Sequence, residues 1–157
     1  MMRKKSKYKP KPVLLNPMGF VLENISPVRA HTSFMLDLKI KNHSAMDFIT
    51  KGKATRSDVD TLIAMVNMTE AFARLGFGSD YSDVVREGLQ ALRDVGKRGA
   101  AAGSFVLKAH EMNALNAAME LHDAQLEVVT LKDMDAAIAL VQEEYRLKKM
   151  TPILENT

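Results

Sequence analysis

Apolar residues recur at intervals of three and four through most of the chain between residues 57 and 149. This spacing places them on one face of an α-helix, whereas a half-buried strand would require strict alternation. Residues 57–75 and residues 80–95 both follow the helical spacing, and a glycine-containing segment separates them. The pattern therefore predicts two consecutive amphipathic helices.

Gly88 lies inside the apolar stripe of the helix predicted over 80–95. A glycine in a helix interior destabilises the helix by about 1 kcal/mol relative to alanine. We therefore interpret Gly88 as a point where another backbone approaches closely.

Two further helices are predicted over 106–129 and 131–149, where apolar residues repeat at a heptad-like spacing. Thr130 is placed to end the first helix and to cap the second. We expect these two helices to form an antiparallel hairpin. Residues 96–104 contain three glycines, so we expect a loop or a weak helical turn there.

Residues 31–50 fit two patterns. Apolar residues alternate with charged ones over 36–40, as in a strand, but others lie at helical spacing. The absence of glycine and proline favours a helix. We therefore predict an all-α fold, a bundle of four or five helices forming a single domain over 31–150, with a weak strand within 34–42 as the alternative.

Positive charge is concentrated at the N-terminus. Six of the 22 Lys and Arg residues lie in residues 1–12, which contain no acidic residue. In the rest of the chain, the remaining 16 basic residues are outnumbered by 19 acidic residues. Pro10 and Pro12 disfavour a helix, and like charges favour an open chain. We predict a disordered basic arm over 1–12 and a connecting segment over 13–30 that docks on the body through its apolar residues.

The arm is a candidate nucleic-acid-binding segment. Its cations could neutralise phosphates of DNA or RNA, and the aromatic ring among them could stack on a base. The candidate residues are Arg3, Lys4, Lys5, Lys7, Tyr8, Lys9 and Lys11. A solubilising tail is the alternative interpretation.

The helices predicted over 57–75 and 80–95 could also form a helix-turn-helix. Arg86, Gln90 and Arg93 share one exposed face of the second helix and could reach base edges. The first helix is longer than this motif normally uses, and acidic residues crowd the same surface. An ordinary pair of bundle helices is the alternative.

His122 is the most conspicuous polar residue in an apolar stripe. It could be a base or a ligand in a bundle pocket, or a buried histidine that hydrogen-bonds to a neighbouring helix. Its neighbour Asp123 points about 100° away around the helix and is not its partner. We favour the buried structural role.

Other chemistry has little support in the sequence. There is no cysteine, so disulfides, thiolate metal sites and a cysteine nucleophile are excluded. His43 with Asp47, or His110 with Glu111, could contribute to a metal site, but isolated pairs of this kind are common on solvated faces. No nucleophile elbow or nucleotide loop occurs. We expect no catalytic residue, metal or cofactor, and no enzyme activity.

Eleven methionines are present, and those left exposed would give a surface able to adapt to partner proteins. The heptad-like stripes could also pair between two copies of the chain, which predicts a homo-oligomer. No run of eighteen apolar residues and no signal-peptide pattern occurs, so we expect a cytoplasmic protein without a membrane span.

Five stretches carry a resemblance to known proteins: RKKSKYKPKP (3–12), LKIKNH (38–43), GKAT (52–55), NMTEA (67–71) and LNAAMELHDAQL (115–126). Through them the chain resembles small proteins of unknown function from phages and prophages of proteobacteria. The resemblance implies an accessory protein that binds a host or phage protein, for example as an inhibitor of a host system, or that assists phage DNA metabolism. It assigns no functional residue.

Overall fold

The computed structural model describes residues 32–147. The arm, the connecting segment and residues 148–157 lie outside the described residues, so the predictions for them stay predictions. The described chain contains five α-helices and one short 3-10 helix, and no strand. These are α2 (Thr32–Thr50), α3 (Arg56–Arg74), η2 (Ser79–Tyr81), α4 (Ser82–Ala102), α5 (Ala109–Leu126) and α6 (Leu131–Arg146). The all-α prediction is confirmed, and the ambiguous segment is a helix.

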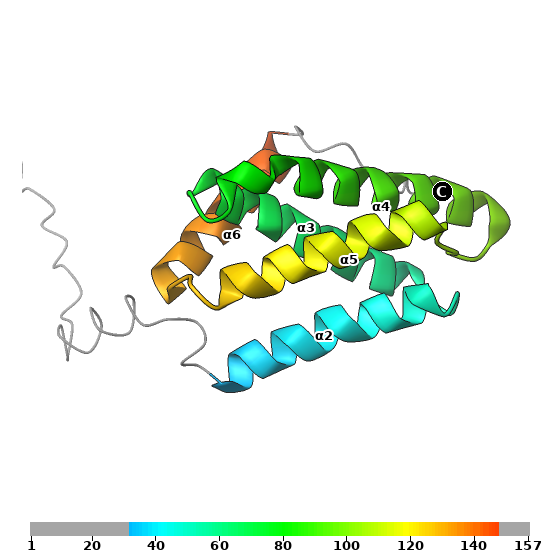
Figure 1. The fold of residues 1–157 in the computed structure, drawn as a ribbon, viewed down its shortest axis with the longest axis horizontal. Coiled ribbons are helices and arrows are strands. Elements are labelled where there is room, and N and C mark those ends of the chain that lie inside the picture. The colour runs from blue at the N-terminus through cyan, green and yellow to red at the C-terminus, as the bar shows by residue number, and fades with distance from the viewer. Residues whose placement is uncertain (1–31, 148–157) are drawn as a thin grey trace, which may run out of the picture.

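Helix α3 is the centre of the bundle, because α2, α4, α5 and α6 all pack against it. Figure 1 shows α5 lying in front of α3, between α4 on one side and α2 on the other, with α6 at one end. The pairing of α4 with α5 is the most extensive of the helix contacts. Gly88 of α4 allows it, because a Cβ there would lie 3.0 Å from the Cβ of Ala118. The predicted close approach at Gly88 is therefore confirmed, with α5 as the neighbour.

The prediction of a loop or a weak helical turn over 96–104 was wrong, because the regular helix α4 continues to Ala102. Gly96 and Gly99 are buried within this helix. A Cβ on Gly99 would clash with the ring of Phe105, so this glycine makes room for a ring that folds back over the helix. Only Gly103 acts as a terminator, with a left-handed φ of 78° at the C-cap.

The predicted hairpin of the last two helices was also wrong. Helix α6 packs on α3, while α5 packs on α4 and α3. Met134 and Ala137 of α6 join Phe72 of α3 in one apolar cluster. A heptad-like stripe shows that a helix has an apolar face, but it does not identify the helix that covers that face. Thr130 does cap α6, where its side chain and that of Asp133 form a capping box.

The core consists of two apolar clusters separated by a polar layer. On α3 the first cluster ends at Val66 and the second begins at Ala71. On α5 the first ends at Met119 and the second begins at Leu126. Buried polar side chains occupy the intervening positions, namely Thr69, His122 and Gln125.

Candidate functional site

His122 lies in this polar layer, with only 2% of its surface exposed. Its Nδ1 is 3.1 Å from the hydroxyl of Thr69, which belongs to α3. Its ring also packs near Phe72, with the ring centroids 6.1 Å apart. The predicted bond from a buried His122 to a neighbouring helix is therefore present.

The hydrogen bonds of Thr69 determine the tautomer of His122. The Thr69 hydroxyl donates its single proton to the backbone carbonyl of Met65 at 2.9 Å. The contact with the imidazole is then a hydrogen bond only if Nδ1–H donates to the Thr69 oxygen. Nε2 consequently carries no proton and is an acceptor, and it has no partner among the described residues.

Burial lowers the pKa of His122 from its ordinary value of 6.5 to about 4, because the charged imidazolium would lose its hydration. Asp123 acts in the opposite direction and His43 in the same direction, but both contributions are smaller. His122 is therefore a neutral acceptor at physiological pH.

Gln125 links the polar layer to the backbone of α3 and of the segment that follows it. Its Nε2 donates to the backbone carbonyls of Thr69 at 3.1 Å and Phe77 at 2.8 Å. These two bonds fix the orientation of the amide, so that Oε1 remains as a second buried acceptor without a partner. The layer thus presents acceptors and no free donor.

A cavity of about 190 Å³ opens between α2, α3 and α6, with His122 in its lining. Most of the wall is apolar, from residues such as Leu38, Met65, Met68, Met134 and Ile138. The buried Asn42 of α2 is also in the wall. A mainly apolar cavity with a few fixed polar groups is the usual composition of a small-ligand site.

A second feature lies on the opposite side of α2. Met35, Asn42 and Ile49 of this helix are buried, but Leu36 and Ile40 are each 55% exposed. At 100° per residue, Leu36 and Ile40 point away from the buried face. With the half-exposed Phe48 they form what we call the α2 outer face.

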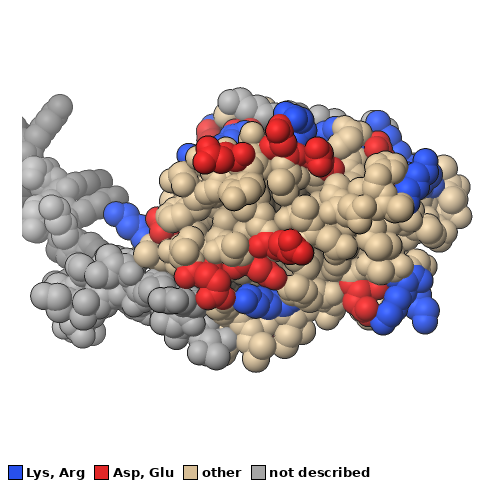
Figure 2. All heavy atoms as spheres, in the orientation of Figure 1, with Lys and Arg blue, Asp and Glu red and all other residues tan. Residues whose placement is uncertain are grey.

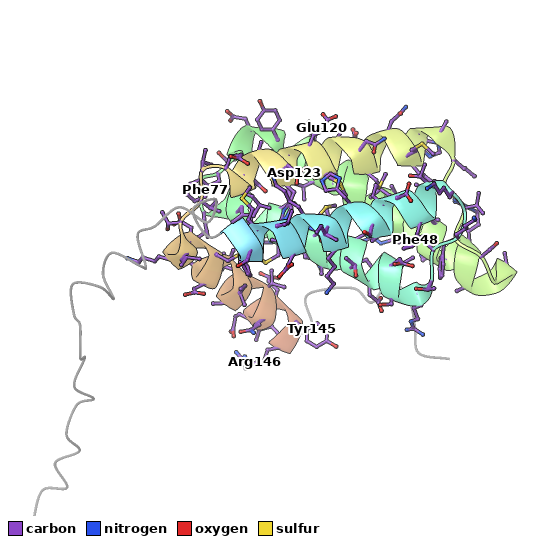
Figure 3. All side chains as sticks on the ribbon, turned by 90° about the horizontal axis from the view of Figure 1, so that it is seen from below. Phe48, Phe77, Glu120, Asp123, Tyr145 and Arg146 are labelled. Carbon is purple, nitrogen blue, oxygen red and sulfur yellow. The ribbon has the colours of Figure 1, made fainter. Side chains whose placement is uncertain are left out.

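Helix α5 borders the α2 outer face with carboxylates. Figure 2 shows acidic side chains along the boundary between the two helices, and Figure 3 labels Glu120 and Asp123 on α5 and Phe48 on α2. Glu120, Asp123 and Asp47 line a groove of about 270 Å³ between the helices. Two contacts link α2 and α5 at this groove or next to it: His43 Nε2 lies 2.8 Å from Asp123, both of which line the groove, and Lys39 Nζ lies 3.3 Å from Glu127.

Members of the two residue pairs considered as metal ligands contact other side chains. Asp47 pairs with Lys51 at 2.7 Å, and His43 pairs with Asp123 instead. Glu111 is buried and accepts two bonds from the guanidinium of Arg98, at 2.7 and 2.6 Å. That guanidinium lowers the pKa of the Glu111 carboxyl below its usual range. Among residues 32–147, no group of three or more histidines and acidic residues could hold a metal ion.

Arg86, Gln90 and Arg93 are together on α4, as expected, and line a shallow cavity of about 470 Å³ with Arg74 of α3. Each of these three α4 side chains contacts another side chain of the same helix. Arg86 pairs with Asp83, Gln90 donates to Asp94, and Arg93 donates to Gln90.

The seven predicted nucleic-acid-binding residues of the arm, Arg3 to Lys11, lie outside the described residues. The sequence did not predict a role for Thr69 or the presence of the α2 outer face. The only signal for that face was the strand-like alternation of apolar and charged residues over 36–40, which places apolar residues on two sides of α2.

No family model, no curated protein and no solved structure matches the chain. In the described part of the chain, none of the helices is both long enough and apolar enough to span a membrane.

Proposed function

We propose that the chain is a non-enzymatic, cytoplasmic interaction protein that binds another protein through the α2 outer face. The observation that carries this proposal is the exposure of Leu36 and Ile40 on the side of α2 opposite the core. Helix packing inside the molecule needs only one face of α2, so the second apolar face has no structural role within the described chain. Exposed apolar groups that adjoin one another are typical of interaction sites.

The side chains of the α2 outer face and of its acidic border indicate which chemical groups a partner would present there. Apolar side chains would fill the space over Leu36, Ile40 and Phe48, and cations would lie against the α5 carboxylates Glu120 and Asp123. An amphipathic helix with Lys or Arg along the edges of its apolar stripe meets both requirements. The acidic border would steer such a partner during encounter, while the apolar contacts would slow its dissociation.

The resemblance to phage and prophage proteins adds a context to the proposal. The partner would be a host or phage protein whose activity is blocked or redirected by this contact.

Capture from a host lysate tests the proposal, with variants matched for exposure. The double variant L36S/I40S removes the apolar face, whereas V106S/V128S removes two residues that are 55% and 62% exposed elsewhere. We expect a stoichiometric partner with the parent chain and with V106S/V128S, but not with L36S/I40S. Equal capture by both variants would contradict the proposal. If the partner is a second copy of the chain, ultracentrifugation will show a dimer that L36S/I40S abolishes.

Nucleic-acid binding through the arm is a second proposal. Its support is the concentration of six cations and no acidic residue in residues 1–12, against a body with an acidic excess. If all six contact phosphates, the logarithm of the affinity for duplex DNA should fall with the logarithm of salt concentration with a slope of about −5. Replacement of the six cations by glutamine should abolish binding, and unchanged binding would exclude the arm.

A further inference from the structure

Ser44 lies at the middle of the exposed side of α2. It points about 140° to 180° around the helix from the buried Met35 and Ile49. In Figure 1, α2 forms one edge of the bundle, so a second helix can lie against this side. The small side chain of Ser44 would let the backbone of such a helix approach closely at this point.

The apolar residues of the α2 outer face match one another across Ser44. In an antiparallel pair of identical helices related by a two-fold axis, each residue lies opposite the residue that is equally far from the axis in the other direction. With the axis at Ser44, Ile40 and Phe48 of one copy lie opposite Phe48 and Ile40 of the second copy, because they are four positions before and after it. These side chains are 55% and 44% exposed in the single chain, and the pairing would cover both of them in both copies.

The charged residues around Ser44 match under the same symmetry. Asp37 and Lys51 lie seven positions before and after Ser44, and all members of this set point within about 60° of it. Lys51 directly follows α2, but its N–H still bonds to the carbonyl of Asp47 at 3.1 Å, so it keeps the helical direction. Lys41 and Asp47 lie three positions before and after Ser44. Each acid of one copy would therefore meet a base of the second copy.

We propose that two copies of the chain pair through their α2 outer faces, with the α2 helices antiparallel around a two-fold axis near Ser44. This inference rests on the proposed use of the α2 outer face as an interaction surface. It names a second copy of the chain as the occupant of that face when no other protein is bound there.

The size of the pairing determines how stable this dimer is. The 19 residues of α2 span ~28 Å, and contact along one face of a single helix buries less than the roughly 1,600 Å² of a standard interface. The dimer is therefore reversible, and its population rises with protein concentration. A partner protein that binds the α2 outer face more tightly can displace the second copy.

Charge reversal tests the pairing and its register. In Asp37→Lys, like charges would face each other at both ends of the helix pair, and the same holds for Lys51→Asp. Sedimentation equilibrium of each full chain over a concentration series gives the dissociation constant of its dimer. We expect D37K alone and K51D alone to dimerise on the order of tenfold more weakly than the parent chain, since each reversal replaces two exposed attractions by two repulsions.

An equimolar mixture of D37K and K51D provides the decisive measurement. In a dimer of one copy of each, every lysine again faces an aspartate, so the mixture should dimerise about as tightly as the parent chain. This rescue would also show that both variants fold. Glu87→Lys makes the same change in charge at an exposed position of α4, on the other side of α5 from α2, and should leave association unchanged (Figure 1).

Three results would overturn the inference. A parent chain that stays monomeric at every concentration has no such dimer, whereas capture of another protein that L36S/I40S abolishes would still support the proposed function. A dimer that neither D37K nor K51D weakens, or that E87K weakens equally, uses another surface or responds only to net charge. A mixture no tighter than its two components would exclude the register centred on Ser44.

Discussion

The buried neutral His122 makes stability depend on pH in a specific direction. Its pKa is about 4 in the folded chain and 6.5 as the ordinary value for an unfolded chain. Between these values the unfolded chain binds a proton that the folded chain excludes, so acid favours unfolding. The stabilising contribution is complete above 6.5, declines as pH falls through that value, and is fully lost at about 4.

The magnitude follows from the same two pKa values. The full difference corresponds to about 3 kcal/mol of unfolding free energy, since each unit contributes about 1.4 kcal/mol. Most carboxyl groups protonate below pH 5, so mainly the four histidines titrate between about pH 7.5 and pH 5, and among the histidines of residues 32–147 His122 is the one that the fold buries. Over that range we expect a loss of about 2 kcal/mol.

Urea denaturation across this range measures the effect. In His122→Phe the proton-linked loss should disappear, leaving a flatter profile whatever the stability of the variant. His110→Gln changes an exposed histidine on the same helix and reports what a surface histidine contributes. If H122F loses stability with acid as steeply as the parent chain, the burial argument for His122 is refuted.

Three substitutions test other parts of the fold by urea denaturation. Gly99→Ala should destabilise the chain despite the better helix propensity of alanine, because displacing the Phe105 ring costs ~1–3 kcal/mol; a more stable variant would show that the ring does not cover the helix. Glu111→Gln should lose ~2 kcal/mol at neutral pH, since it removes the charge that binds the partly exposed Arg98; a neutral effect would contradict the paired geometry. Thr130→Ala should lose ~1 kcal/mol through the cap of α6, and no change would argue against the capping box.

The helices could be predicted from sequence because the spacing of apolar residues is a local property. Gly88 was interpreted correctly for a related reason, since a glycine inside a stripe has few explanations other than close packing. The three glycines of 96–104 misled the prediction, because the reason for Gly99 is a ring that lies after the end of the helix. The pairing of α6 with α3 depends on long-range packing that no local pattern contains.

Only part of the candidate site could be predicted from the sequence. His122 was conspicuous as a polar residue in an apolar stripe, but its partner Thr69 lies 53 residues away on another helix. The tautomer depends on a third group, the carbonyl of Met65, which only the folded chain brings into reach. Apolar residues on both sides of α2 were recognised as an alternation and interpreted as a possible strand. In the fold, the same alternation gives the helix a second, exposed apolar face.

Site-specific photocrosslinking tests the proposed interaction most directly. A photoreactive phenylalanine analogue is placed at Leu36 on the α2 outer face or, as the control, at the equally exposed Val106. The proposal predicts a discrete adduct of one partner from position 36 in host cells, and none from position 106. Absence of an adduct at position 36, or the same adducts from both positions, would contradict binding through the α2 outer face.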